Sequence, residues 1–127
     1  MITLNDAVKL VWHAFEDSRG GEIYVKKIPS MNIMDIAKAV NSKSKIKIIG
    51  IRPGEKIHEQ MIGSEDSANT LEYKNYYKIL PSLFDWSKDK NRIKNGKKVK
   101  ENFIYSSDNN LKWMTIGELQ IWIKNNL

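Results

Sequence analysis

The sequence lacks cysteine, which excludes a disulfide framework and any metal site built on thiolates. It has no apolar run close to the ~18 residues of a membrane-spanning helix, and no basic region followed by a long apolar segment at its start. Histidine is scarce, with only His13 and His58 present, so no metal site is expected. These absences predict a cytoplasmic protein that binds neither a metal nor a membrane.

Motifs for nucleotide cofactors and for catalysis are missing as well. There is no Gly-x-Gly-x-x-Gly and no loop with a Walker lysine, so we expect this chain to bind no cofactor. No tyrosine is followed four residues later by lysine, which excludes the proton-relay pair of short-chain dehydrogenases. His58 and Glu59 could begin a zinc-protease motif, but Ile62 stands where the second histidine is required. We therefore predict that this chain holds no catalytic residue.

The net charge of +6 over 127 residues is concentrated in one basic run. This run consists of Lys88, Lys90, Arg92, Lys94, Lys97, Lys98 and Lys100. It could be an anion-binding arm, or a solvated loop in a chain that uses lysine throughout. No aromatic residue lies inside the run, although aromatic rings usually accompany such charge on a nucleic-acid surface. We favour the loop and expect no nucleic-acid partner.

Local signals predict helices in three places. Thr3 and Asp6 have the spacing of a capping box, and apolar residues then recur at helical spacing as far as Phe15. A second helix is predicted after residues 29–32 and ends near Asn41. A last helix begins at the capping box of residues 115–118. His13 lies on the first helix without a second ligand at metal-binding spacing, which indicates a surface or boundary histidine.

Strands are predicted between and after these helices. Residues 22–25 and 45–49 have the apolar character of short strands, and residues 73–80 and 103–105 are expected to be extended. Residues 64–70 are polar and expected to be irregular, and the order of residues 82–102 is left open. Alternation of helix and strand predicts an α/β layered fold.

A turn at the end of the second predicted strand is the strongest candidate for a ligand site. Proline keeps Arg52 extended, and Pro53-Gly54 can reverse the chain because glycine accepts positive φ. Glu55 would begin a short helix that places Ile57 and Met61 on one face. The turn suits a ligand with phosphate at one end and hydroxyls at the other. Two alternatives remain: an Arg52–Glu55 salt bridge, and acid/base work by Glu55 with Glu59 on adjacent helical turns.

The turn lies in a motif that closely resembles that of the inverting UDP-N-acetylglucosamine 4,6-dehydratases. These enzymes belong to the extended short-chain dehydrogenase/reductase superfamily and to the capsule and flagellin-glycan polysaccharide biosynthesis proteins. The motif reads Ile48-Ile49-Gly50-Ile51-Arg52-Pro53-Gly54-Glu55-Lys56-Ile57-His58-Glu59. Similar flanking segments are residues 2–8, 21–25, 27–31, 64–81 and 105–110. The resemblance covers the whole chain and is weakest over residues 87–100.

The resemblance implies the C-terminal part of such an enzyme, with Arg52 on the UDP diphosphate and Glu55 on the ribose hydroxyls. Residues 1–28 would be the last helix and strand of an incomplete Rossmann domain. Residues 29–81 would form the substrate-binding region, and residues 82–127 a mainly irregular extension that ends in a helix. The implied reaction is an NADP-dependent lyase reaction with inversion at C5, in bacterial surface polysaccharide or glycan biosynthesis.

The expected ligand is therefore UDP-N-acetylglucosamine or a related UDP-sugar. The cofactor loop and the Tyr-x-x-x-Lys pair are absent, so we expect this chain to be inactive alone and to need the missing nucleotide-binding domain or a partner subunit. In full-length form we expect a homo-oligomer. Other functions remain open: a non-catalytic nucleotide-sugar-binding or subunit-interaction module, and, less favoured, a basic nucleic-acid-binding module.

Overall fold

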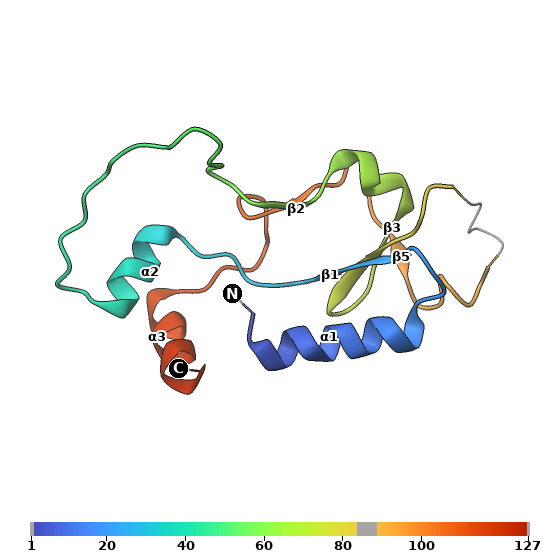
Figure 1. Cartoon of the computed structure of the whole chain (residues 1–127), viewed down its shortest axis with the longest axis horizontal. Helices are drawn as coiled ribbons and strands as arrows, with labels where there is room; N and C mark the ends of the chain where they lie inside the picture. Colours follow the sequence, from blue (N-terminus) through green and yellow to red (C-terminus); the bar gives the residue numbers. More distant parts are fainter. Residues whose placement is uncertain (1, 84–88, 127) are drawn as a thin grey trace. The chain divides into compact units, whose positions relative to one another are not determined.

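The computed structural model describes residues 2–83 and 89–126 (Figure 1). Lys88 of the basic run, and with it part of the segment 82–102 whose order was left open, lies outside the described residues. The described helices and strands are α1 (Leu4–Asp17), β1 (Ile23–Lys26), α2 (Ile33–Val40), β2 (Gln60–Ile62), the 3₁₀ helix η1 (Ser64–Asn69), β3 (Thr70–Glu72), β4 (Tyr76–Ile79), β5 (Lys97–Lys98), β6 (Tyr105–Ser106) and α3 (Ile116–Asn126). This mixture of helices and strands confirms the α/β class.

The chain divides into two compact units, each built from distant segments. One unit joins Ile2–Ile28 to Gln60–Tyr105, and the other joins Pro29–Glu59 to Ser106–Leu127. The predicted division into three functional parts, residues 1–28, 29–81 and 82–127, is a separate matter and stays a prediction.

The first unit is built on a four-stranded sheet in the order β1-β4-β3-β5, and β2 and β6 form a separate two-stranded sheet. The paired strands of the larger sheet are antiparallel, and β1 meets β4 with Val25 opposite Tyr77. Side chains alternate between the two faces of a strand. One face carries Val25, Tyr77 and Ile79, which pack with Ile62 and Tyr105 into the buried core.

The opposite face of this sheet is turned toward α1, which runs alongside it (Figure 1). It carries Tyr24 and Lys78, which contact Asp17 of α1, and Leu71, which lies opposite Lys78. The helix begins as predicted, because the Thr3 hydroxyl accepts from the Asp6 amide at 3.0 Å. Polar bonds therefore tie the end of α1 to the sheet.

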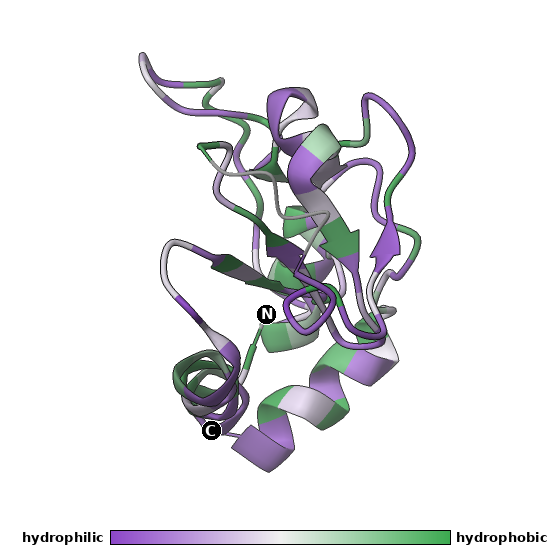
Figure 2. Ribbon diagram, turned by 90° about the vertical axis from the view of Figure 1, so that its right-hand side faces the viewer, coloured by the Kyte–Doolittle hydropathy of each residue, from purple (hydrophilic) through white to green (hydrophobic). Residues whose placement is uncertain are grey.

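Five apolar residues of α1 lie on an exposed side of the helix, whereas Ala7, Leu10 and Ala14 are half-buried. The exposed five are Leu4, Val8, Val11, Trp12 and Phe15, and we call them the α1 stripe. The exposed fraction is 82% for Leu4 and 76% for Phe15. Hydrophobic segments recur along α1 in Figure 2. An amphipathic helix normally buries its apolar stripe against the core, but the α1 stripe is exposed within this chain.

The second unit contains α2 and α3, which contact each other. Asn32 caps α2 by accepting from the Met34 amide, and α3 begins at the predicted box, where the Thr115 amide donates to the Glu118 carboxylate at 2.8 Å. The backbone of Ser30 bonds to residues 112 and 114, which ties the segment before α2 to the segment before α3. Local capping therefore explains where these helices start.

Two elements predicted around the turn are wrong. Residues 45–49 form no strand, because no described strand pairs with them, and Ile48 is 85% exposed. A strand needs a neighbour to bond its backbone, so an apolar run alone does not make one. The helix after Glu55 is absent too, since the Ser107 amide donates to the Glu59 carbonyl at 2.8 Å and β2 follows directly. Without that helix, Glu55 and Glu59 do not share adjacent turns.

One polar segment is more ordered than predicted, and a second, for which no prediction was made, contributes a strand. Residues 64–69 form η1 where an irregular segment was expected, and the Ser67 hydroxyl donates to the Ser64 carbonyl within it. The basic run, whose order was left open, contributes β5 to the sheet, where Leu71 lies opposite Lys98. The strand predicted at residues 103–105 forms slightly later, as β6.

Candidate functional site

The predicted site residues Arg52 and Glu55 lie at the two ends of one tight turn. The Glu55 amide donates to the Arg52 carbonyl at 3.0 Å, and Gly54 has a φ of +85°. Proline at the second position and a glycine with positive φ at the third are typical of a type II turn. The turn predicted from the Pro-Gly pair is thus present, although its flanks differ from the prediction.

The Glu55 side chain closes this turn. Its Oε2 accepts a hydrogen bond from the Arg52 amide at 2.8 Å, and its Oε1 lies 3.8 Å from the Arg52 Nε. This is the salt bridge that the sequence left open as a structural alternative. The side chains remain 72% and 49% exposed, and an ion pair in solvent contributes only about 0–1 kcal/mol.

The ion pair leaves the guanidinium able to bind another group. At 3.8 Å the Nε contact is too long for a hydrogen bond, and Arg52 makes no other side-chain bond to any described residue. A guanidinium can bind a phosphate with two parallel bonds, and a carboxylate can accept from two neighbouring hydroxyls. The turn therefore presents the Arg52 guanidinium and the Glu55 carboxylate side by side in solvent, at the 3.8 Å of their ion pair.

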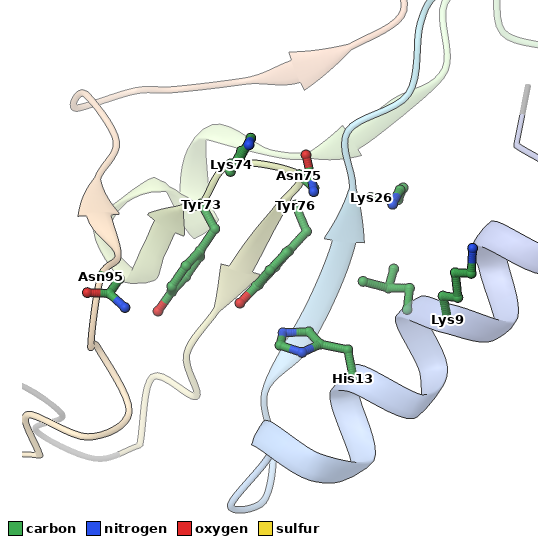
Figure 3. Close-up of a pocket in the computed structure, with 9 residues that line it drawn as sticks. Lys9, His13, Lys26, Tyr73, Lys74, Asn75, Tyr76 and Asn95 are labelled. Carbon is green, nitrogen blue, oxygen red and sulfur yellow. The ribbon is translucent and has the colours of Figure 1, made fainter.

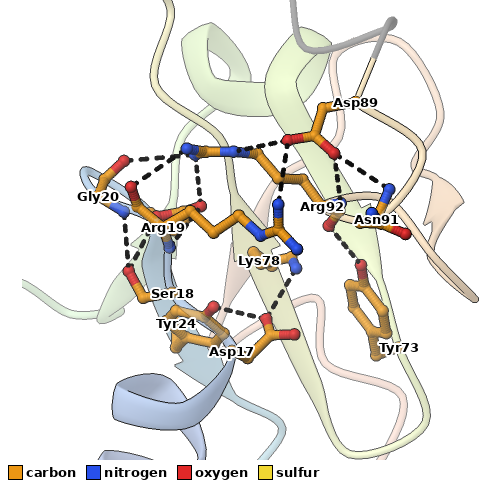
Figure 4. Close-up of polar contacts among 11 residues, drawn as sticks. Asp17, Ser18, Arg19, Gly20, Tyr24, Tyr73, Lys78, Asp89, Asn91 and Arg92 are labelled. Carbon is orange, nitrogen blue, oxygen red and sulfur yellow. Dashed lines mark hydrogen bonds and ion pairs between the residues drawn. The ribbon is translucent and has the colours of Figure 1, made fainter.

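A second polar cluster, in the first unit, lies between α1 and the sheet (Figure 4). The Lys78 Nζ donates to the Asp17 Oδ2 at 2.8 Å, and the Tyr24 hydroxyl donates to the same oxygen at 2.6 Å. The Lys78 side chain is only 2% exposed, and its Nζ lies 5.2 Å from the centroid of the Tyr73 ring. A buried ammonium thus has one carboxylate partner and an aromatic neighbour.

The electrostatics of this cluster follow from its contacts. Burial raises the pKa of the Asp17 carboxyl, but the hydrogen bonds from Lys78 and Tyr24 outweigh it and hold that pKa below its usual value. Burial, with the hydrogen bond to Asp17, raises the pKa of the Tyr24 phenol. The lowered pKa keeps Asp17 ionised at neutral pH, and the raised pKa keeps the Tyr24 phenol neutral.

Arg92 of the basic run forms a third cluster, which ties its loop to the turn after α1 (Figure 4). Its Nη1 donates to the Glu22 carboxylate at 2.6 Å, its Nε to Asp89 at 3.2 Å, and its Nη2 to the Arg19 carbonyl at 3.1 Å. The side chains of Arg92 and Glu22 are 11% and 1% exposed. One cation of the basic run is therefore structural.

Sequence reasoning missed Lys78 and Arg92, whose partners lie 61 and 70 residues away. A lysine inside the aromatic and aliphatic run of β4 was a usable signal for the first. His13 is half-buried, and its ring contacts those of Tyr24 and Tyr76, which fits the boundary position predicted for it. For Arg92, the usable signal was that it is the one arginine of the basic run.

Two kinds of feature are absent from the described residues. No helix among residues 2–83 and 89–126 is long and apolar enough to cross a membrane. Within the same part of the chain, no three histidine, cysteine, aspartate or glutamate side chains come together as a metal site would require.

A family model described as polysaccharide biosynthesis protein matches residues 1–81. A UDP-N-acetylglucosamine 4,6-dehydratase (inverting) of Campylobacter jejuni subsp. jejuni serotype O:2 is 50% identical over 123 residues, which are 93% of this chain and 37% of that protein. A UDP-glucose 4-epimerase of Rickettsia canadensis is 39% identical over 113 residues, which are 86% of this chain and 33% of that protein.

A solved structure is similar over nearly the whole chain. The X-ray structure of Pen from Bacillus thuringiensis matches with a TM-score of 0.81 and 28% identity, over 98% of this chain and 37% of that one. The present chain thus spans about a third of the length of the curated relatives and of the structure that it matches.

Proposed function

Because the chain belongs to the polysaccharide biosynthesis protein family, we propose that it is the UDP-sugar-binding C-terminal part of a UDP-N-acetylglucosamine 4,6-dehydratase that inverts C5. The product would enter bacterial surface polysaccharide or glycan biosynthesis. The observation that carries the proposal is the turn in which Arg52 and Glu55 stand side by side in solvent. The 50% identity to a protein named for this activity supports the choice of substrate.

In this proposal Arg52 binds the diphosphate of the UDP-sugar and Glu55 accepts from the ribose hydroxyls. The exposed guanidinium makes no strong bond that a phosphate would have to displace. The Oε2 of Glu55 is held by the Arg52 amide, which fixes the carboxylate and leaves Oε1 for a hydroxyl. Binding would replace a weak solvent-exposed ion pair by charge-assisted hydrogen bonds to the ligand.

Catalysis and NADP binding are assigned to residues outside this chain, in a nucleotide-binding domain or a partner subunit. The α1 stripe supports this assignment, because it exposes five apolar side chains at helical spacing while the other side of α1 makes polar contacts with the sheet. Exposed apolar patches of this kind are typical of interaction surfaces. We propose that the missing domain or subunit covers the stripe, and that the complete protein is a homo-oligomer.

Charged substitutions on the stripe test its role. We expect the chain to self-associate through the stripe when nothing covers it. Val11→Asp with Phe15→Lys keeps the net charge, and should shift the chain toward monomer in sedimentation velocity without lowering its melting temperature. Asn5→Asp with Glu16→Gln, also on α1 and also neutral in net charge, is the control and should leave association unchanged. A variant that unfolds would mean that the stripe packs inside the chain.

Titration with UDP-N-acetylglucosamine tests the proposed ligand. We expect the chain to bind it and Arg52→Ala to weaken binding by about 10- to 100-fold. This factor corresponds to the free energy of one hydrogen bond to a charged group. Lys56→Ala removes the same charge close by and should have little effect. If the chain did not bind UDP-sugars but bound DNA in a salt-dependent manner, the result would support the basic nucleic-acid-binding module instead.

The non-catalytic nucleotide-sugar-binding or subunit-interaction module would give the same titration. It differs in the complete protein, where it would bind the UDP-sugar without converting it. Conversion by this chain alone would contradict the assignment of catalysis to residues outside it.

A further inference from the structure

A cavity of about 500 Å³ opens in the first unit, between α1, β1 and the turn that joins β3 to β4 (Figure 3). Its lining residues are Lys9, Leu10, His13, Lys26, Tyr73, Lys74, Asn75, Tyr76 and Asn95. None of them belongs to the turn of Arg52 and Glu55. The volume lies within the roughly 300–1,000 Å³ that is usual for small-molecule sites.

The charged side chains that line this cavity are all lysines. Lys9, Lys26 and Lys74 come from three different segments, and the lining contains no carboxylate. Among residues 2–83 and 89–126, no acidic group lies within ion-pair distance of these three lysines. Two other lysines of the sheet differ, because Lys27 pairs with Glu72 and Lys78 pairs with Asp17. The cavity thus gathers lysines whose charge the described part of the chain does not neutralise.

One wall of the cavity is a row of flat rings. Tyr73 and Tyr76 are stacked, with centroids 4.7 Å apart and an angle of 7° between the planes, and the His13 ring lies 4.8 Å from Tyr76. Figure 3 shows the two phenol rings side by side, with His13 projecting toward Tyr76 from α1. Burial, helped by the Asp17 charge, raises the pKa of both phenols, so they remain neutral at physiological pH. The rings therefore offer apolar surface without opposing an anion.

We propose that this cavity binds a small organic anion that carries a flat ring, of the class of aryl phosphates and aryl carboxylates. The lysines of α1, β1 and the β3–β4 turn bind its anionic group, and Leu10 with the aromatic row contacts its ring. The amides of Asn75 and Asn95 add hydrogen bonds at the rim. Both parts of the ligand are needed, because a bare phosphate would leave most of the cavity empty.

Phenyl phosphate is the probe, and inorganic phosphate and phenol are its two halves. We expect phenyl phosphate to shift the backbone NMR signals of Asn75, Tyr76 and Asn95 in the full chain, with a Kd of about 1 mM or tighter. Each half alone should bind at least about 10-fold more weakly, and added salt should weaken binding. Benzoate in place of phenyl phosphate shows whether a carboxylate is accepted as well as a phosphate.

Paired variants separate this site from general charge attraction. Lys9→Ala with Lys74→Ala should weaken phenyl phosphate binding by 10-fold or more. Lys90→Ala with Lys100→Ala lowers the net charge equally, outside the cavity, and should change the affinity less than 2-fold. Arg52→Ala should have no effect, which keeps this test independent of the UDP-sugar site. Equal losses in both lysine pairs, signal shifts outside the cavity, or equal affinity for inorganic phosphate would each overturn the proposal.

Discussion

Replacing Lys78 by methionine removes the most deeply buried cation described in the chain and keeps nearly the same length of side chain. Its Nζ donates to Asp17 at 2.8 Å, and its side chain is 2% exposed. Removing one partner of a buried pair costs roughly 3–5 kcal/mol, because the other charge is left without compensation. The Asp17 side chain is 32% exposed and still accepts a hydrogen bond from Tyr24, which reduces this cost. We therefore expect Lys78→Met to lower the free energy of unfolding by about 2–3 kcal/mol.

Lys27→Met is the matched control. Lys27 also lies at the sheet and pairs with Glu72 at 2.6 Å, but the two side chains are 26% and 47% exposed. Its pair is therefore expected to contribute only about 0–1 kcal/mol. Adding Asp17→Asn to Lys78→Met should recover part of the loss, because no unpaired charge then remains.

Urea unfolding followed by circular dichroism measures these differences, and its pH dependence gives a second check. The folded pKa of Asp17 is lowered, so the stabilisation from its ionised form is present above the unfolded value near 3.8 and is lost as pH falls through the folded value. The difference between the wild-type chain and Lys78→Met should therefore be largest at neutral pH and shrink below about pH 4. A Lys78→Met variant no less stable than Lys27→Met would refute the reasoning.

Four further substitutions probe other parts of the structure. Arg92→Met leaves the buried Glu22 carboxylate without its 2.6 Å partner and should cost roughly 3 kcal/mol of unfolding free energy in urea titrations. Gly54→Ala places a side chain at a φ of +85°, which strains the turn and should weaken UDP-sugar binding measured by calorimetry. Gly117→Ala is the control at the start of α3, where a side chain meets open space, and should stabilise the chain by about 0.5–1 kcal/mol or leave it unchanged. Thr115→Ala removes the N-terminal box of α3 and should cost about 1 kcal/mol, with earlier amide exchange in the first turn of that helix.

The features that sequence could predict are those decided within a few residues. The boxes at Thr3 and Thr115 place the starts of α1 and α3, and the Pro-Gly pair places the turn, because each depends on bonds three residues apart. The strand predicted at residues 45–49 is absent because a strand depends on partners that are distant in the sequence. Its pattern was suitable, but a strand exists only where another strand bonds to it, and none of the described strands does.

The polar clusters could not be predicted either, because their partners are far apart in the sequence. The partners of Lys78 and Arg92 are fixed by the register of β1 against β4 and by the path of the loop before β5, neither of which a single sequence displays. The α1 stripe is instructive in another way. Its helical spacing predicted the helix correctly, but spacing alone does not say what covers an apolar face, and within this chain this face is exposed.

The proposed role of Arg52 can be tested most directly by comparing UDP with uridine on the wild-type chain and on Arg52→Ala. If the guanidinium binds the diphosphate, UDP should bind the wild-type chain about 10- to 100-fold more tightly than uridine, and this difference should largely vanish in the variant. Uridine itself should bind both forms equally. If Arg52→Ala kept the full preference for UDP, the diphosphate would be bound elsewhere, and the assignment of Arg52 would be wrong.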